Sequence, residues 1–259
     1  MASLRDKVVL LTGASSGIGA GAAVQLASLG AKLVLSGRNQ SALEQTKSQC
    51  LANGGTPEKL CLVLGDVTKE ADREALVQAA LEKFGGIDSL INNAGSIVVG
   101  TVEDSPLSQY DSIMDVNTRS IVALTKLALP SIKERKGTIV NVSSVNGPCS
   151  FAGVTYYCMS KAALDQFTKC LALEMAPAGV RVNSINPGVI VTNIHKRGGM
   201  DEAAYAAFLE RSKTTHALGR AGSVEETAKA IAFLASDDSS FTTGHLLSVD
   251  GGRGIMTPR

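Results

Sequence analysis

Short apolar runs alternate with longer amphipathic stretches along almost the whole chain. The runs are rich in Val, Ile and Leu, and they cover residues 7–11, 32–35, 59–64, 89–91, 138–143, 180–185 and 246–249. Strands that are apolar on both faces and are separated by helices form a parallel sheet with helices on both sides. The alternation therefore predicts an α/β fold with seven strands. No linker, internal repeat or low-complexity tract interrupts it, so we expect a single domain over residues 1–259.

The segments between these runs carry apolar residues at helical spacing. The expected helices cover residues 17–29, 40–52, 69–84, about 108–133, 156–175, 200–213 and 223–235. Periodicity predicts which side chains face the sheet. In the second helix these are Leu43 and Leu51, and in the long helix after residue 108 they include Ile113, Leu124 and Leu127.

Composition excludes several classes of protein. Hydrophobic residues make up 44% and charged residues 19%, which is typical of a chain that builds a large core. The net charge of +1 argues against nucleic acid as the main partner. No apolar run is long enough to span a membrane. The first residues lead straight into a strand and leave no room for a signal peptide, so we expect a cytoplasmic protein.

Cysteine and histidine are sparse and scattered. The five cysteines are an odd number without a Cys-x-x-Cys pair, which favours reduced, mostly buried thiols. The three histidines at 195, 216 and 245 lack the spacing of metal ligands, so we expect no metal site.

A glycine-rich turn follows the first strand and opens the first helix. It comprises Thr12, Gly13, Ala14, Ser15, Ser16, Gly17, Ile18 and Gly19. Glycines permit a tight turn and a close backbone approach, and the helix N-terminus offers free N–H groups and a positive dipole end. The position of the turn after the first strand of a parallel sheet predicts a site for a dinucleotide pyrophosphate.

The end of the second strand bears on the choice of dinucleotide. A carboxylate there accepts hydrogen bonds from the ribose of NAD, and the segment 35–39 has none. Arg38 can instead pair with a 2′-phosphate and stack on adenine. The sequence therefore favours NADP(H), with NAD(H) as the alternative. Asp66 and Val67 end the third strand, where a carboxylate can accept the adenine amino group.

Tyr157 and Lys161 stand four residues apart in an expected helix and so share one face. A free phenol has a pKa of about 10, and a neighbouring ammonium favours the phenolate and lowers that pKa. Upstream, the run 137–144 is typical of a buried strand that ends in the hydroxyls of Ser143 and Ser144. A serine hydroxyl beside a tyrosine hydroxyl can hold a substrate carbonyl oxygen while the tyrosine delivers a proton.

Taken together, these motifs resemble the short-chain dehydrogenase/reductase family over about residues 5–252. The matching positions occur in the family's order and spacing: the glycine-rich turn, Asn92-Asn93-Ala94-Gly95, Asn117, Ser144, Tyr157 with Lys161, Pro187-Gly188 with Thr192, and Val249-Asp250-Gly251-Gly252. The resemblance implies a Rossmann-type, doubly wound sheet in the strand order 3-2-1-4-5-6-7.

The resemblance also implies roles for individual residues. Tyr157 is then the proton donor to a carbonyl or the base toward an alcohol, and Lys161 lowers its pKa and binds the nicotinamide ribose. Ser144 holds the substrate oxygen, and Asn117 positions a water that links Lys161 to solvent. Residues expected to contact the cofactor are Asn93, Ala94, Gly95, Pro187, Gly188, Ile190 and Thr192. Ser16 departs from the basic residue that many NADP-dependent relatives carry, so the preference for NADP(H) rests on Arg38.

The remaining expectations concern the substrate and the assembly. Residues 193–218 are expected to form a lid, and the apolar residues in it suggest a medium-sized carbonyl or alcohol substrate. Alternatives are a 3-oxoacyl thioester reductase, an NAD-dependent hydroxysteroid or retinol-type dehydrogenase, and a non-catalytic dinucleotide sensor. The resemblance implies a homotetramer, or a homodimer, with helices 108–133 and 156–175 at one two-fold interface.

Overall fold

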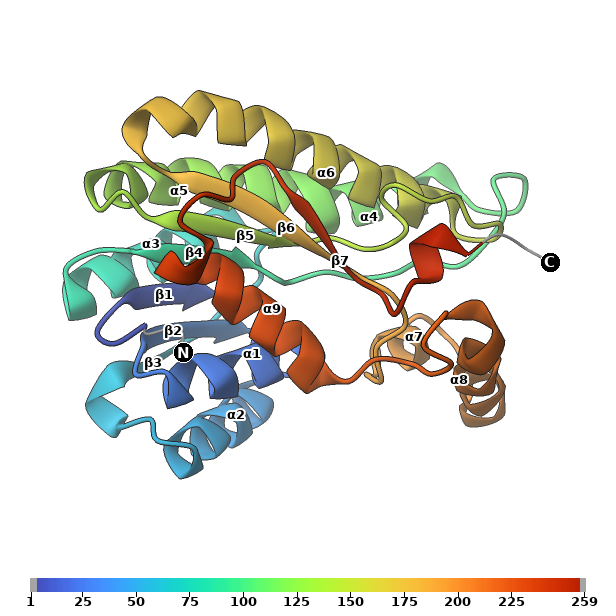
Figure 1. Ribbon diagram of the computed structural model, residues 1–259, viewed down its shortest axis with the longest axis horizontal. Coiled ribbons are helices and arrows are strands. Elements are labelled where there is room, and N and C mark those ends of the chain that lie inside the picture. Colours follow the sequence, from blue (N-terminus) through green and yellow to red (C-terminus); the bar gives the residue numbers. More distant parts are fainter. Residues whose placement is uncertain (1–3, 257–259) are drawn as a thin grey trace.

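A computed structural model describes residues 4–256 of the chain. Residues 1–3 and 257–259, at the ends of the expected domain, lie outside the described residues. Seven parallel strands form one sheet in the order β3-β2-β1-β4-β5-β6-β7, which confirms the predicted fold class and strand order (Figure 1). The strands are β1 Val8–Leu11, β2 Lys32–Gly37, β3 Leu60–Leu64, β4 Ser89–Asn92, β5 Thr138–Val142, β6 Arg181–Pro187 and β7 Leu246–Val249.

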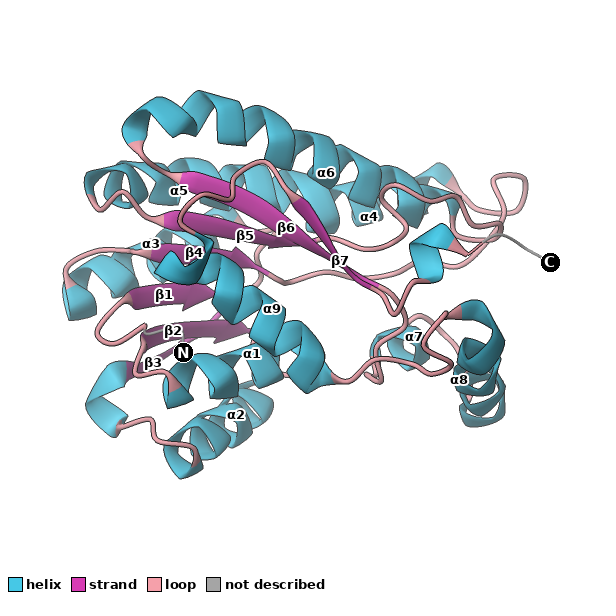
Figure 2. Cartoon of the chain, viewed as in Figure 1, coloured by secondary structure: helices cyan, strands magenta, loops and turns pink. Residues whose placement is uncertain are grey.

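Helices cover both faces of this sheet (Figure 2). The longer helices are α1 Gly17–Ser28, α2 Gln40–Ala52, α3 Glu70–Phe84, α4 Leu107–Met114, α5 Ser120–Glu134, α6 Thr155–Met175, α8 Glu202–Thr215 and α9 Val224–Ala235. A four-residue helix, α7 Ile194–Arg197, precedes α8. The 3-10 helices are η1 Pro57–Lys59, η3 Ala176–Ala178, η4 Asp237–Ser239 and η5 Arg253–Ile255. No helix within residues 4–256 is both long enough and apolar enough to cross a membrane.

Each strand contributes to two cores because successive side chains point to opposite faces. Val9 and Leu11 of β1 belong to the core under α1, α2 and α9. Leu10, between them, belongs to the core under α3, α5 and α6. All three side chains are fully buried. This explains why the strands appear in the sequence as continuous apolar runs rather than as alternating patterns.

Helical spacing predicted that Leu51 and Leu127 face the sheet, and this prediction was wrong for both residues. Leu51 of α2 is 36% exposed, and its neighbour Cys50 is buried instead. Leu127 of α5 is 38% exposed, whereas Ala128 is buried. The expected long helix contains a π turn, η2 Asp115–Arg119, between α4 and α5. The wider turn adds about one residue to the helical repeat, which moves the inward position from residue 127 to residue 128.

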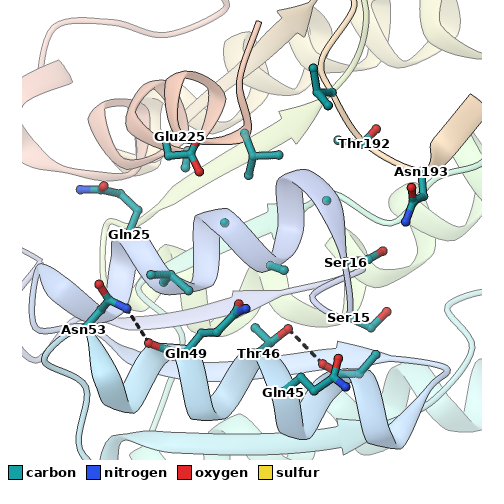
Figure 3. A pocket seen from close by; sticks show the side chains of 18 of the residues that line it. Ser15, Ser16, Gln25, Gln45, Thr46, Gln49, Asn53, Thr192, Asn193 and Glu225 are labelled. Carbon is teal, nitrogen blue, oxygen red and sulfur yellow. Dashed lines mark hydrogen bonds between the residues drawn. The ribbon is translucent and has the colours of Figure 1, made fainter. Parts of the chain in front are cut away.

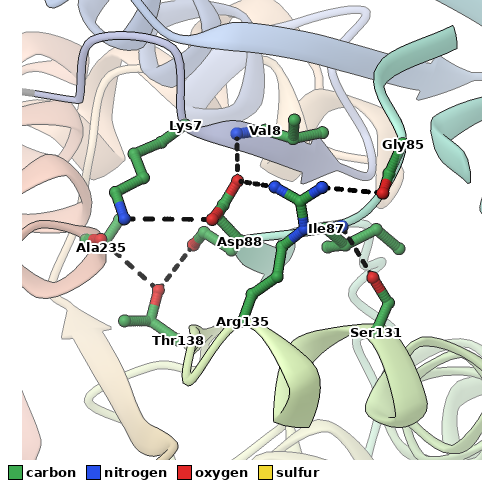
Figure 4. Close-up of polar contacts among 10 residues, drawn as sticks. Lys7, Val8, Gly85, Ile87, Asp88, Ser131, Arg135, Thr138 and Ala235 are labelled. Atoms are coloured by element: carbon green, nitrogen blue, oxygen red, sulfur yellow. Dashed lines mark hydrogen bonds and ion pairs between the residues drawn. The ribbon is translucent and has the colours of Figure 1, made fainter.

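A polar cluster closes the amino edge of the sheet, away from the cleft described below (Figure 4). Asp88 accepts hydrogen bonds from the Val8 backbone N–H at 2.8 Å and from Arg135 at 3.3 Å. Lys7 lies 3.9 Å from the other carboxylate oxygen. Arg135 also donates to the Gly85 carbonyl at 2.7 Å. These contacts tie the start of β1 to the loops that flank α3 and α5.

Candidate active site

A cleft of about 950 Å³ lies at the carboxyl ends of the strands. A crevice forms there because the strand order reverses between β1 and β4, so the connections after these two strands run in opposite directions. All but two of the predicted site residues line the cleft; the exceptions are Gly19 and Asn117. The structure therefore brings together residues that are spread from Gly13 to Thr192 in the sequence.

The glycine-rich turn is held against the β4 end by side-chain hydrogen bonds. Asn93 donates from its amide nitrogen to the carbonyls of Thr12 at 2.9 Å and Gly13 at 3.1 Å. The Thr12 hydroxyl accepts from the backbone N–H groups of Asn93 and Ala94. Gly19 lies behind the turn, and a Cβ on it would stand 2.2 Å from the Gly13 carbonyl oxygen. Gly19 therefore permits the turn to form without itself facing the cleft.

The N-terminus of α1 is open toward this turn. Ser16 precedes the helix with an extended backbone and makes no side-chain capping bond, and the first helical turn holds no acidic residue. Unpaired N–H groups and the helix dipole thus stand at the cleft, as an anion requires.

Arg38 and Asp66 meet at the far end of the cleft, after β2 and β3. Their side chains approach to 3.8 Å, and the Arg38 side chain is 76% exposed. Partial burial by itself raises the pKa of Asp66, but two hydrogen bonds from Thr68 and the charge of Arg38 outweigh it and leave that pKa below its usual value. Asp66 is therefore ionised at neutral pH and offsets part of the positive charge of Arg38.

Ser144, Tyr157 and Lys161 stand together at the centre of the cleft. Ser144 lies close enough to Tyr157 to affect its pKa, and the Ser144 hydroxyl donates to the Asn146 side-chain oxygen at 3.2 Å. The Lys161 side chain is almost fully buried, with 4% of the residue exposed, and it donates to the Val142 carbonyl at 2.9 Å. Its ammonium lies 5.8 Å from the centre of the Tyr157 ring.

The expected lowering of the Tyr157 pKa was wrong for the structure described here. Burial raises the pKa of Tyr157 to about 12, and the hydrogen bond with Ser144 offsets only part of that rise. Burial also lowers the pKa of Lys161 to about 8, against a smaller opposing effect of Asp165. Desolvation is the largest effect on both pKa values because each charged form loses its water on burial.

Asn117 lies in the π turn, outside the lining of the cleft. Its side-chain oxygen accepts from the Ser96 N–H at 2.9 Å, and its amide nitrogen donates to the Ser96 carbonyl and to the Ser160 hydroxyl, both at 3.0 Å. Ser160 in turn donates to the Tyr157 carbonyl at 2.7 Å. Asn117 thus joins the loop after β4 to the first turns of α6.

Asp165 supports the other side of the same centre and was not predicted. It is buried and accepts from the Asn186 amide nitrogen at 3.0 and 3.1 Å. Asn186 also donates to the Ser144 carbonyl at 2.9 Å. Burial raises the pKa of Asp165, against hydrogen bonds from Ser143 and Asn186. Its spacing of four residues from Lys161 is the sequence signal that could have identified it.

The segment 193–218, which we expect to be a lid, contains α7 and α8, and these helices lie beyond the carboxyl edge of the sheet near η5 (Figure 1). From this segment Ile194, His195, Met200 and Phe208 line the cleft. The His195 and Phe208 rings have centres 4.5 Å apart. Sequence reasoning missed three further residues that line the lid end: Arg211, Thr215 and Arg253.

A second, polar groove of about 800 Å³ runs between α1, α2 and α9 (Figure 3). Neutral amides such as Gln25, Gln45 and Gln49 line it, and Asn53 donates to the Gln49 carbonyl at 2.8 Å. It shares Ser15, Ser16, Gly17 and Thr192 with the main cleft but contains none of Ser144, Tyr157 and Lys161. The reactive groups therefore belong to the main cleft.

Neither metal ligands nor disulfides contribute to the site. Within residues 4–256, no group of three His, Cys, Asp or Glu residues could hold a metal ion. All five cysteines are free thiols.

Comparison with known proteins identifies the family. Residues 13–253 match the family model described as Enoyl-(Acyl carrier protein) reductase. Meso-2,3-butanediol dehydrogenase of Serratia marcescens is 37% identical, over 95% of this chain and 94% of its own length. A short-chain dehydrogenase/reductase of unknown function from Caenorhabditis elegans, solved with cofactor, superposes with a TM-score of 0.94 at 34% identity, covering 98% of this chain and 97% of that one.

The chain belongs to the short-chain dehydrogenase/reductase family. Another member, 3-oxoacyl-(acyl-carrier-protein) reductase FabG of Thermotoga maritima, is 36% identical over 96% of this chain and 98% of its own length. Enzymes of the family are oxidoreductases that act on CH–OH and C=O groups and bind NAD(P)(H). The cleft fits such a dinucleotide: it offers an uncapped helix N-terminus, an exposed arginine, and a buried ammonium beside a phenol.

Proposed function

We propose that this protein is an NADP(H)-preferring oxidoreductase that interconverts a carbonyl and an alcohol, with Tyr157 as the acid/base. The observation that carries the proposal is the grouping of Ser144 and Tyr157 beside the buried Lys161, in the same cleft as the glycine-rich turn. A phenol, a hydroxyl and an ammonium are the groups that reduction of a carbonyl needs around its oxygen.

Tyr157 and Ser144 have different roles at the substrate oxygen. A bound dinucleotide supplies the hydride from its nicotinamide C4. Tyr157, with a pKa of about 12, holds its proton at neutral pH and can donate it to the oxygen. The Ser144 hydroxyl donates a hydrogen bond that fixes the oxygen beside the phenol.

Lys161 supports Tyr157 in this scheme. A pKa of about 8 keeps its ammonium charged at neutral pH but close to titration, so it can return a proton to the tyrosine after each turnover. Ribose hydroxyls of the dinucleotide would accept hydrogen bonds from the same ammonium. Asn117 anchors the loop and helix turn around this group, and the water relay assigned to it remains a prediction.

Arg38 supports the preference for NADP(H), because it is exposed at the end of the cleft where a 2′-phosphate would lie. Asp66, 3.8 Å away, opposes this preference through its negative charge. Arg38→Ser should therefore lower kcat/KM for NADPH by about tenfold to a hundredfold, the loss of one charge-assisted hydrogen bond, and change NADH little. Arg119→Ser is the matched control, since Arg119 is exposed and lies outside the cleft.

The test is the initial rate of NADPH and NADH oxidation with a panel of diketones, quinones, retinal, steroid ketones, sugars and β-ketoacyl thioesters. Turnover that Tyr157→Phe reduces by several orders of magnitude supports the proposal. Unchanged turnover in Tyr157→Phe contradicts it. Binding of dinucleotide without turnover of any panel member would favour a non-catalytic sensor.

The same panel separates the enzymatic alternatives. Preference for β-ketoacyl thioesters would indicate a 3-oxoacyl thioester reductase, and preference for steroid or retinoid substrates with NADH would indicate the NAD-dependent dehydrogenase. The substrate-covering lid, the homotetramer and the cytoplasmic location remain predictions. A sedimentation mass equal to one chain would refute the assembly.

A further inference from the structure

Three arginines from separate segments of the chain line the main cleft, and two of them, Arg211 and Arg253, are close enough for their charges to interact. Arg197 ends α7, Arg211 belongs to α8 and Arg253 begins η5, and all three line the cavity that contains Ser144 and Tyr157. The sequence gives no sign of this cluster, because Arg253 lies more than forty residues beyond Arg211.

No carboxylate among the described residues forms an ion pair with these arginines. Of the described residues that line the cleft, Asp66 alone carries a carboxylate, and it pairs with Arg38. Arg38 follows β2 and Arg253 follows β7, and four strands lie between these two. At about 4.8 Å per strand, the ends of β2 and β7 are about 24 Å apart, so Arg38 and Asp66 are not part of the arginine cluster.

Arg253 forms no ion pair, although the charge of Asp250 acts on it, and other contacts hold its side chain in place. Its guanidinium donates to the Thr215 hydroxyl at 2.9 Å and lies 4.9 Å over the centre of the Phe151 ring. It is half-buried, and burial lowers its pKa, with the charge of Arg211 as the next contribution. Asp250 is nearby, but its two carboxylate oxygens accept from the Gly252 and Gly254 backbone N–H groups at 3.0 and 2.7 Å.

The cluster is connected to the proposed reaction centre. Gly254 packs against Val145, the residue after Ser144, where an added Cβ would stand 3.3 Å from the Val145 side chain. The Cys149 thiol also donates to the Gly254 carbonyl at 3.6 Å. The loop that begins at Ser144 therefore supports η5, the helix that begins with Arg253.

We infer that Arg253 and Arg211 bind an anionic group, a carboxylate or a phosphate, on the far end of the carbonyl substrate. Arginine presents a planar set of donors that matches either anion, and a partly desolvated guanidinium gains most from such a partner. Phe151 and Phe208 line the same cleft and offer apolar surface to the rest of such a substrate. The inference rests on the proposed function of the cleft and narrows its substrates from carbonyls in general to anionic ones.

The first experiment compares charged and neutral substrates of the same shape. The pairs are acetoacetate, levulinate and longer oxo acids with their methyl esters, and dihydroxyacetone phosphate with dihydroxyacetone. Wild-type protein should show kcat/KM at least about tenfold higher for the charged member of one series, and that series distinguishes carboxylate from phosphate. Equal or better turnover of the neutral members overturns the inference while leaving the proposed oxidoreductase intact.

Variants then locate the effect. Arg253→Gln should lower kcat/KM for the charged member by about tenfold to a hundredfold and leave the neutral member and the dinucleotide Kd within about twofold. Arg253→Lys should retain part of the effect, since it keeps the charge and loses the planar donors. Lys213→Gln, an exposed change on the same helix as Arg211, is the control for general loss of charge. Equal losses on charged and neutral members, or a weakened dinucleotide, would overturn the inference.

A binding measurement keeps this test separate from turnover. Calorimetry with hexanoate and with inorganic phosphate, in the presence of excess oxidised dinucleotide, needs no reaction. Saturable binding that Arg253→Gln removes and Lys213→Gln retains supports the anion site even if every carbonyl on the panel is inert. Absence of binding to wild-type protein by both probes, together with no preference for charged substrates, refutes it.

Discussion

Replacing Lys161 by methionine should stabilise the free protein at neutral pH while removing its activity. Burial lowers the pKa of Lys161 from 10.5 to about 8. At about 1.4 kcal/mol per pH unit, keeping this ammonium charged in the folded state costs about 3 kcal/mol at pH 7. Methionine has a similar length and no charge, but it leaves the Val142 carbonyl without its 2.9 Å hydrogen bond, which costs about 1 kcal/mol. The expected net gain is about 2 kcal/mol.

The lowered pKa of Lys161 determines how the free energy of unfolding changes with pH. The unfolded chain keeps the lysine proton up to a pH near 10.5, whereas the folded chain releases it near pH 8. Between these values the unfolded state binds more protons, so the stability of wild-type protein rises with pH. The penalty is fully present below about pH 8 and disappears toward pH 10.5. The advantage of Lys161→Met should shrink over the same interval.

The assay is urea unfolding at one protein concentration, without added dinucleotide, at about pH 7 and about pH 10. Lys169→Met, an exposed change on the same helix, is the control and should alter the free energy of unfolding by less than about 0.5 kcal/mol. A Lys161→Met protein that is less stable than wild type at pH 7 would refute the reasoning. So would a stability difference that stays constant between the two pH values.

Three further predictions test other parts of the structure. Asp88→Ala leaves the Val8 N–H and Arg135 without their acceptor, so urea unfolding should show a loss of about 2–3 kcal/mol, with KM unchanged. Gly19→Ala places a Cβ 2.2 Å from the Gly13 carbonyl oxygen, so calorimetry should show dinucleotide affinity reduced at least about tenfold; an unchanged Kd would contradict this. Burial raises the pKa of Asp165 above 3.8, so wild-type stability should fall as pH rises from 3.8 through the folded-state pKa, and Asp165→Asn should lack that fall in thermal melts.

The fold was predictable from the sequence because its main signal is local. The central strands are buried on both faces, so a run such as 8–11 is apolar without interruption, and the structure places a strand at each predicted run. Helix faces were less predictable because they depend on phase. The π turn at 115–119 shifts the helical repeat, so Ala128 is buried and Leu127 is exposed. The residue types in that turn do not predict it.

The site was predictable where a motif names the residue and unpredictable where contact depends on tertiary packing. Ser144, Tyr157 and Lys161 line one cleft as expected. Arg253 follows the motif that ends at Gly252, yet only the packing of η5 against the loop after Ser144 brings it to the cleft. The direction of the Tyr157 pKa was missed for the same reason, since four-residue spacing gives proximity to Lys161 but not the degree of burial.

Tyr157, Lys161 and Asp165 recur every four residues on one face of α6, and burial disfavours the charged form of each. Three buried ionisable groups lower the stability of the fold, and aliphatic side chains could fill the same space. What they provide is a phenol that keeps its proton beside an ammonium whose pKa lies near neutrality, because burial raises the Tyr157 pKa to about 12 and lowers the Lys161 pKa to about 8. A ligand that brings hydroxyls or an anion into this site changes the pKa values of these buried groups more than it would change the pKa of an exposed group. The increase in the free energy of unfolding that we expect for Lys161→Met therefore measures what the free protein loses in stability by keeping a charged group in place for the dinucleotide and substrate.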